Sequence, residues 1–131
     1  MELTDEQWRE RLTDEQYQVL RRSATEPPGT GKYLHVDAAG TFRCAGCGAE
    51  LFSTDHKFDS ACGWPSFDRV AAAGNVVERL DRSHHMERTE IVCARCGGHL
   101  GHVFPDGPTD TGQRYCVNSL ALDLDPPVPA G

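Results

Sequence analysis

Cysteine is the residue type through which this sequence is best equipped to do chemistry, because six cysteines occur in 131 residues. Four of them form two Cys-x-x-Cys pairs, Cys44 with Cys47 and Cys93 with Cys96, and a glycine follows each pair. Four thiolates bind zinc tetrahedrally, and the tight turn of each pair favours a glycine with positive φ. The pattern therefore predicts one structural zinc ion held by two distant loops. An iron–sulfur cluster and a thioredoxin-type redox motif are the alternatives, although the redox motif opens a helix and these pairs lie at strand ends.

Cys116 is one of the two cysteines left over, and its neighbours favour a reactive thiol. Residues 114–118 are predicted to form a strand, and alternation then places Arg114, Cys116 and Asn118 on one face. A guanidinium and an amide beside a thiol lower its pKa and favour the nucleophilic thiolate. The alternative is that Cys116 is a small buried apolar residue and Arg114 a solvated surface charge.

Imidazole, aromatic and carboxylate groups gather in His99, His102, Phe104 and Asp106. In a regular strand the two histidines would face opposite sides, but Gly101 between them is typical of a bulge that turns both to one side. Histidine assists proton transfer near neutral pH, and we favour His102 over His99 for this role. Either ring is alternatively a structural residue with satisfied hydrogen bonds.

Cys62, the other leftover cysteine, lies in a loop rich in glycine and proline that also contains Trp64. A cysteine on such a loop can reach a second sulfur after a local rearrangement. The indole of Trp64 offers a flat apolar wall suited to a methyl group or a thioether stem. Ordinary core packing is the alternative role for this tryptophan.

The elements that position these residues change in character along the chain. Thr4 and Thr13 each precede a glutamine by three residues, which is the capping-box pattern, and Pro27 and Pro28 end the helical stretch. Short β-branched and aromatic segments then follow, namely 33–36, 41–44, 76–80, 89–93, 103–104 and 114–118. We therefore predict a mainly β fold in one domain over residues 1–131, with a helical segment at about 4–24, a β core at about 32–124 and a disordered tail at 125–131.

Composition narrows the classes of partner and location. The formal net charge of −7 repels phosphate backbones, so nucleic acid is not an expected partner. No apolar run approaches the roughly 20 residues of a membrane span, and the acidic N-terminus lacks the pattern of a secretory signal. We therefore expect a cytoplasmic monomer whose cysteines serve metal and redox chemistry rather than three disulfides.

Three motifs in a fixed order give the sequence a specific resemblance. Gly-Trp-Pro-Ser-Phe stands at 63–67, His-Leu-Gly-His-Val-Phe at 99–104 and Arg-Tyr-Cys-Val-Asn-Ser at 114–119. Together with the two Cys-x-x-Cys pairs, they make the chain similar to the B class of peptide methionine sulfoxide reductases, which act on the R epimer of the sulfoxide. The chain departs from this family's usual pattern at Ala61, His85 and Gln113, where glycine, glycine and an apolar residue are commoner.

The resemblance implies a fold, a cofactor and a set of roles. It implies two antiparallel sheets with short N-terminal helices, as in the B-class reductases and Mss4-like proteins, and one zinc ion on the four paired cysteines. It implies Cys116 as nucleophile and Cys62 as the resolving cysteine, with Trp64 and Phe104 at the substrate. The remaining residues that line or support the implied site are His99, His102, Asp106, Arg114 and Asn118.

The reaction implied by the resemblance uses both free cysteines. Cys116 attacks the sulfoxide sulfur of an oxidised methionine while His102 or a water protonates the oxygen, and Cys116 becomes a sulfenic acid. Cys62 then forms a disulfide with Cys116, which thioredoxin reduces. A zinc-ribbon binding module without redox activity, and a Cys–His–Asn hydrolase built on Cys116, His102 and Asn118, are the alternative functions.

Overall fold

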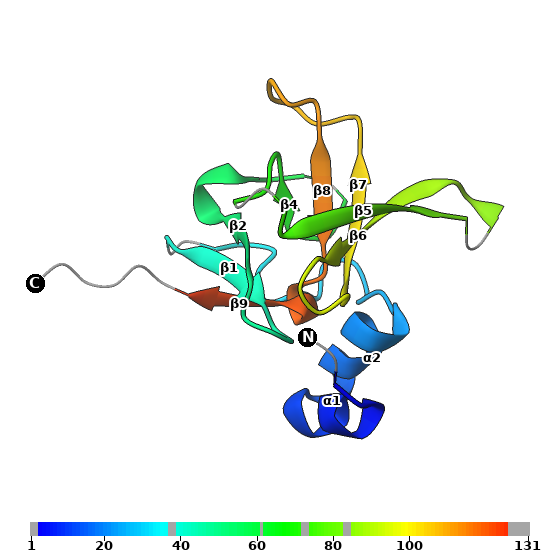
Figure 1. Ribbon diagram of the computed structural model, residues 1–131. Helices are drawn as coiled ribbons and strands as arrows, with labels where there is room; N and C mark the ends of the chain where they lie inside the picture. The colour runs from blue at the N-terminus through cyan, green and yellow to red at the C-terminus, as the bar shows by residue number, and fades with distance from the viewer. Residues whose placement is uncertain (1–2, 37–38, 61, 72–73, 83–84, 126–131) are drawn as a thin grey trace, which may run out of the picture.

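The computed structural model describes residues 3–36, 39–60, 62–71, 74–82 and 85–125, and it is mainly β, as the sequence predicts (Figure 1). Two helices, α1 (Asp5–Arg11) and α2 (Asp14–Arg22), precede two antiparallel sheets. The strands are β1 (Thr41–Cys44), β2 (Glu50–Ser53), β3 (Lys57–Phe58), β4 (Ser66–Phe67), β5 (Val76–Asp81), β6 (Arg88–Cys93), β7 (His99–Phe104), β8 (Arg114–Val117) and β9 (Leu122–Asp125). Single 3₁₀ turns, η1 (Thr54–His56) and η3 (Ser119–Ala121), lie before β3 and β9.

Both helices begin with the predicted capping boxes. Thr4 and Thr13 each accept a hydrogen bond from the backbone N–H three residues on, and the glutamine at that position returns the contact. The second helix ends at Arg22, before the prolines at 27 and 28, because Ser23 takes a left-handed conformation with φ 58°. Within the described ranges, neither of these short helices, nor any other, has the length and apolar character needed to cross a bilayer.

The smaller sheet has the order β2-β1-β9, and its strand β9 runs one residue further than the predicted β core. Asp125, the expected first residue of the tail, pairs with Thr41 and is the last residue of β9. The predicted strand at 33–36 is wrong, since these residues form turns and bends. Tyr33 there packs edge-on against Phe42 at 5.3 Å and its hydroxyl accepts from Leu124 N, so its aromatic ring serves the sheet without joining it.

The larger sheet has the order β3-β4-β8-β7-β6-β5, and its register aligns polar residues across the strands. Ser66 pairs with Cys116, Cys116 with His102, His102 with Glu90, and Glu90 with Arg79. Directly paired residues point to the same face of an antiparallel sheet, with Cβ atoms about 4.5–5.5 Å apart. One row of side chains therefore runs across the sheet and contains Cys116 and His102.

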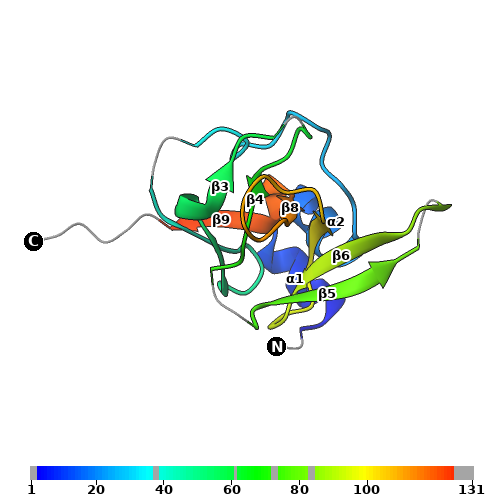
Figure 2. The same ribbon diagram turned by 90° about the horizontal axis from the view of Figure 1, so that it is seen from above.

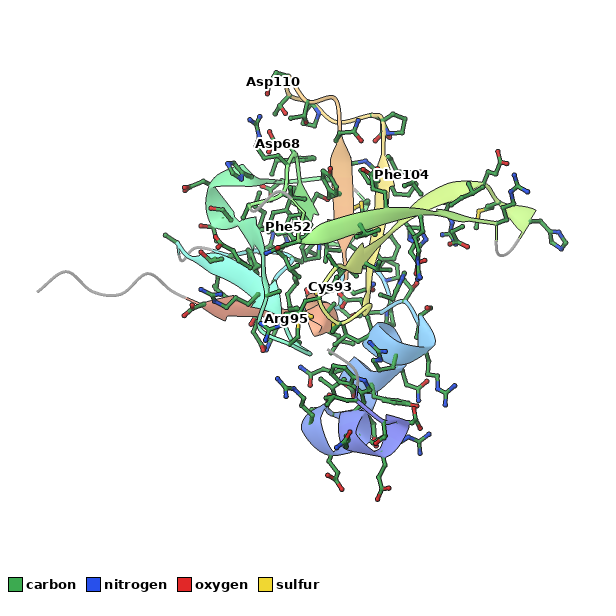
Figure 3. The ribbon with its side chains drawn as sticks, viewed as in Figure 1. Phe52, Asp68, Cys93, Arg95, Phe104 and Asp110 are labelled. Carbon is green, nitrogen blue, oxygen red and sulfur yellow. The ribbon has the colours of Figure 1, made fainter. Side chains whose placement is uncertain are left out.

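Aromatic rings join the two sheets into one core. Phe42 and Phe52 of the smaller sheet contact Phe67 of the larger one, with ring centroids 5.3 and 4.5 Å away, and all three are fully buried. Figure 3 places Phe52 at the centre of the molecule, between the strands of the two sheets. Burial of each ring contributes about 1.5–3 kcal/mol to folding, so this cluster fixes how the sheets meet.

Candidate active site and metal centre

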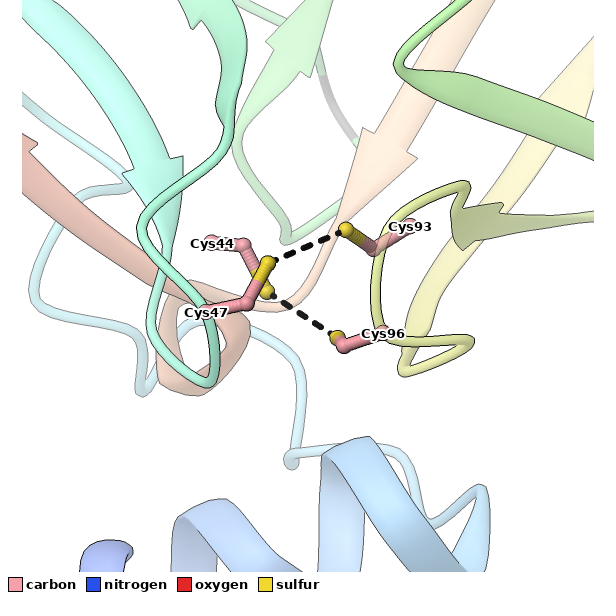
Figure 4. Close-up of side chains that lie close together, drawn as sticks. All are labelled: Cys44, Cys47, Cys93 and Cys96. Carbon is pink, nitrogen blue, oxygen red and sulfur yellow. Dashed lines mark hydrogen bonds between the residues drawn. The ribbon is translucent and has the colours of Figure 1, made fainter. Parts of the chain in front are cut away.

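The two Cys-x-x-Cys pairs form matching turns at the ends of different sheets. Gly48 N donates to Cys44 O and Gly97 N donates to Cys93 O, both at 2.8 Å, and the two glycines have φ of 81° and 74°. The first turn joins β1 to β2 and the second joins β6 to β7. Figure 4 shows the four side chains converging from these two turns. The predicted role of the trailing glycines in the turns is confirmed.

The geometry of the four sulfurs fits a tetrahedral metal ion. All four lie within 4.8 Å of one another, and the separations are 3.7 Å for Cys44 to Cys96 and 3.5 Å for Cys47 to Cys93. A tetrahedral ion with bonds of about 2.3 Å to sulfur holds its ligands roughly 3.8 Å apart. Hydrogen bonds among the thiols raise the pKa of Cys44 and lower that of Cys93. The four cysteines are therefore placed to bind a metal ion.

The N-terminal helices cover this metal centre. A Cβ at Gly46 would lie 3.2 Å from the Trp8 ring, and one at Gly98 would lie 2.8 Å from the Leu20 side chain. Arg21 donates to the carbonyl of Cys96 at 2.8 Å and lies over the Trp8 ring. Figure 1 and Figure 2 show both helices beside the ends of the sheets that carry the two turns. The helices therefore close the metal centre from outside.

A second group of side chains lines a pocket of about 260 Å³ on the polar face of the larger sheet. Cys116 is buried at its wall, and the Cys62 sulfur lies 3.1 Å from the Cys116 sulfur. A disulfide bond is about 2.05 Å long, so closing by about 1 Å joins the two sulfurs. The rearrangement of the Cys62 loop expected from the sequence is thus small.

The two thiols ionise as a pair. Burial raises the pKa of Cys62, but side-chain hydrogen bonds with Ser66 and Cys116 and a hydrogen bond with the Trp64 backbone outweigh it and lower that pKa to about 7. Burial, and then the adjacent Cys62 sulfur, raise the pKa of Cys116 to about 12. Two sulfurs this close do not both carry a negative charge, so the pair of thiols loses one proton near neutral pH. The pair therefore supplies one thiolate at physiological pH.

Arg114 draws that negative charge towards Cys116. Its Nη1 donates to the Cys116 sulfur at 2.9 Å, and its other nitrogens donate to both carboxylate oxygens of Asp106 at 2.7 and 3.0 Å. The guanidinium lies over the Phe104 ring, 4.6 Å from its centroid. The hydrogen bonds from Arg114 hold the pKa of Asp106 below its usual range. Asp106 and Phe104 thus hold the Arg114 guanidinium beside the Cys116 sulfur.

We expect loss of Arg114 to make Cys116 less reactive at neutral pH. In a Cys62→Ser background, Arg114→Ala removes a cation that lowers the pKa of Cys116, so that pKa rises and the thiolate fraction at pH 7 falls. An opposite charge at this distance shifts a pKa by about 1–3 units, so alkylation of Cys116 by iodoacetamide slows at least about tenfold. The alkylation profile moves to higher pH, whereas Arg43→Ala, which breaks an exposed pair with Asp125, leaves it in place. An unchanged profile in Arg114→Ala contradicts the electrostatic role.

The two predicted histidines lie side by side but differ in their access to the pocket. A bulge in β7 pairs Ile91 with Gly101 and Val92 with His99, and the His99 and His102 rings are 5.5 Å apart. The bulge predicted near Gly101 is therefore confirmed. Burial lowers the pKa of His99, whose side chain is 4% exposed, and only His102 lines the pocket of Cys116. Gly101 is required there, since a Cβ on it would overlap the Cys116 carbonyl oxygen.

Trp64 and Asn118 are held by the same stretch of backbone. The indole N–H of Trp64 donates to Glu26 O at 2.9 Å, and Glu26 N donates to the Asn118 side-chain oxygen at 3.0 Å. Asn118 also donates to Leu100 O, and both side chains line the pocket. Gly29 N donates to Gly63 O beside the Cys62 loop. Residues 26–29 therefore support one wall of the pocket.

The structure brings most of the predicted site residues together. Seven of them line the pocket together with Thr25, Arg88 and Gly101, namely Cys62, Trp64, His102, Phe104, Arg114, Cys116 and Asn118. Asp106 and His99 lie outside it and contact lining residues. Asp81 and Glu90 were not predicted from the sequence, and their carboxylates lie 2.8 Å from His102 Nε2 and 2.6 Å from His99 Nδ1. Their only signal is alternation along β5 and β6, which does not reveal the partner strand.

Comparison with known proteins places the chain in a family. The SelR domain matches residues 12–126. A protein from Bradyrhizobium diazoefficiens named peptide methionine sulfoxide reductase MsrB is 59% identical over 123 residues, covering 94% of this chain and 88% of its own. Proteins of the same name from Chromohalobacter salexigens and Thiobacillus denitrificans are 54% and 55% identical, and each alignment covers 94% of this chain and 93% of the relative. With this identity along nearly its whole length, the chain belongs to the SelR domain family of peptide methionine sulfoxide reductases.

Proposed function

We propose that this protein reduces the R epimer of methionine sulfoxide, mainly in peptides and proteins, to methionine. The observation that carries the proposal is the pair of sulfurs, Cys62 and Cys116, 3.1 Å apart beside a pocket that Trp64 also lines. The relatives named peptide methionine sulfoxide reductase MsrB support the substrate class. A tryptophan face suits the apolar methyl and methylene groups next to the sulfoxide.

The chemistry follows from the positions of the pocket residues. Cys116, as a thiolate beside Arg114, attacks the sulfoxide sulfur while His102 gives a proton to the sulfoxide oxygen. The protonated oxygen then passes from the substrate sulfur to the Cys116 sulfur, which breaks both the S–O bond of the substrate and the S–S bond formed by the attack. Methionine leaves and Cys116 becomes a sulfenic acid, so the substrate sulfur gains the two electrons that Cys116 loses. Phe104 and Trp64 contact the apolar part of the substrate. Asn118 holds the backbone of Glu26, Asp106 holds Arg114, and His99 packs beside His102.

Cys62 completes the proposed cycle. Its thiol attacks the sulfenic sulfur of Cys116, a disulfide forms and water leaves with the proton of that thiol. A dithiol protein then reduces the disulfide by exchange, and we propose thioredoxin as that partner. The short distance between the two sulfurs favours this step over further oxidation of the sulfenic acid.

We propose that the metal held by the four paired cysteines is one structural zinc ion. Four thiolates fill its coordination shell and leave no position for substrate, so when bound it supplies fold stability rather than catalysis. We further propose that residues 1–131 act as a single domain, as a monomer in the cytoplasm, without a nucleic acid or membrane partner.

Epimer-resolved turnover tests the proposed function. A peptide containing methionine sulfoxide is separated into its R and S forms, and each is incubated with metal-loaded protein and dithiothreitol. We expect the R form to be converted to methionine and the S form to persist. Persistence of both forms contradicts the proposal and favours a binding module. The hydrolase alternative has little support, because the Asn118 amide contacts Leu100 and Glu26 rather than a histidine.

We expect Cys62→Ser to separate reduction from recycling. With the nucleophile and its cation intact, the variant makes one methionine per chain in the absence of reductant and accumulates a sulfenic acid that dimedone traps. Turnover supported by thioredoxin falls at least about a hundredfold, because no intramolecular disulfide forms. Undiminished turnover with thioredoxin contradicts the resolving role of Cys62. Wild-type protein, which forms the disulfide and reacts little with dimedone, is the control.

A further inference from the structure

His102 separates the pocket of Cys116 from a second, polar cavity of about 280 Å³. This second cavity is lined by two carboxylates, two arginines and two histidines, with Thr25, Arg88 and His102 shared between the two cavities: Ser23, Thr25, Arg79, Asp81, Arg88, Glu90, His99 and His102. The ring of His102 therefore has the nucleophile on one side and acidic groups on the other. Its side chain is only 12% exposed, so these neighbours determine its orientation.

Asp81 holds the His102 ring by one defined atom. The Asp81 Oδ2 lies 2.8 Å from His102 Nε2, and Arg88 Nη2 lies 3.4 Å from the same oxygen. The Asp81 side chain is 18% exposed and comes from β5, two strands away from His102 on β7. An ionised carboxylate accepts hydrogen bonds only, so a neutral His102 ring carries its proton on Nε2 and leaves a lone pair on Nδ1.

We propose that Asp81 is a positioning residue that fixes the tautomer of His102 for proton transfer to and from the reacting groups. This inference rests on the proposed function and adds a residue to it. When Cys116 ionises beside Arg114, Nδ1 of His102 takes the proton that the thiol releases. The resulting imidazolium then gives this proton to the sulfoxide oxygen as the Cys116 thiolate attacks sulfur. No external proton is needed, and the carboxylate of Asp81 stabilises the imidazolium between the two transfers.

The second histidine–carboxylate pair does not serve the same purpose. Glu90 Oε2 lies 2.6 Å from His99 Nδ1, but His99 does not line the pocket of Cys116 and is almost fully buried. Its position in β7 and its edge-on contact with the His102 ring make it a support for that ring. Of the two histidine–carboxylate pairs, the one formed by Asp81 and His102 is therefore the pair whose histidine lines the pocket of Cys116.

Asp81→Asn provides the test, with Asp81→Glu as the conservative variant. Because asparagine can both donate and accept, the Nε2–H tautomer loses its preference, and methionine formation in a single turnover slows about 10- to 100-fold. We expect kcat to fall while KM changes less than about threefold. The rate of Asp81→Glu should recover part of the loss. Nitrogen NMR of His102, at a pH where the ring is neutral, reports a single Nε2–H form in the wild type and a mixture in Asp81→Asn.

Asp125→Asn is a matched control, since Asp125 also pairs with an arginine, at 2.8 Å, but in the smaller sheet. It should leave both the single-turnover rate and the His102 spectrum unchanged. A normal rate and an unchanged tautomer in Asp81→Asn would overturn the inference. A slower rate with an unchanged tautomer would also overturn it, because it would assign Asp81 a purely structural role. Failure of the wild type to reduce the R epimer would instead overturn the proposed function.

Discussion

Replacing Cys116 with serine is expected to lower the rate of methionine sulfoxide reduction at least about a thousandfold, equivalent to roughly 4 kcal/mol of transition-state stabilisation. A serine hydroxyl is a far weaker nucleophile than a thiolate and cannot form the sulfenic acid. The substitution is close in volume, so the buried position at the wall of the pocket remains filled. Steady-state turnover of the R epimer with dithiothreitol measures the effect.

The result is interpretable only beside a second cysteine variant. Cys62→Ser makes the same chemical change 3.1 Å away and retains the first reduction step in our mechanism. If Cys116→Ser keeps more than a few per cent of wild-type turnover, the nucleophile is assigned wrongly. If both variants lose the first step equally, the two thiols act together in it and the division into nucleophile and resolving cysteine fails.

Removing the metal is expected to unfold the protein. The two Cys-x-x-Cys turns belong to different sheets, so a metal ion would join them directly through cysteines 46 to 52 residues apart along the chain. Structural zinc contributes about 10–16 kcal/mol in zinc-finger peptides, whereas whole domains are stable by only about 5–15 kcal/mol. Circular dichroism should therefore show loss of the cooperative thermal transition after a chelator acts on the denatured protein, and its return with added zinc.

Matched cysteine substitutions separate the metal ligands from the other thiols. Cys93→Ser should bind less than one zinc ion per chain by elemental analysis and melt at a much lower temperature. Cys62→Ser should retain one ion and a transition close to that of the wild type. A metal-free protein with an unchanged transition would contradict the structural role of the metal, whatever its effect on turnover.

The parts of the site that sequence predicts are those set by local spacing. A Cys-x-x-Cys-Gly turn determines its own geometry, and alternation within β8 places Arg114 and Cys116 on one face without knowledge of any other strand. The bulge in β7 is likewise predicted by Gly101, which lies between two histidines. These features depend on neighbours within a few residues, and the structure agrees with each of them.

The parts that sequence does not predict depend on pairing between distant segments. Asp81 meets His102 only because β5 pairs with β6, and β6 with β7, in one particular register. A shift by one residue would turn Asp81 to the opposite face, and nothing within β5 itself fixes that choice. The strand predicted around Tyr33 is wrong for the same reason, since this aromatic residue packs on Phe42 of the sheet from a turn.

The cover that Trp8, Leu20 and Arg21 form over the metal centre has a kinetic consequence. We expect an incoming chelator or competing ion to reach the sulfurs faster when the helices detach, an opening that costs part of the stability of the folded chain. Ion exchange in the folded protein is then limited by this opening and becomes independent of chelator concentration. We therefore expect a molecule that binds its metal while it folds to retain it, so that its metal content would record the supply at the time of its synthesis.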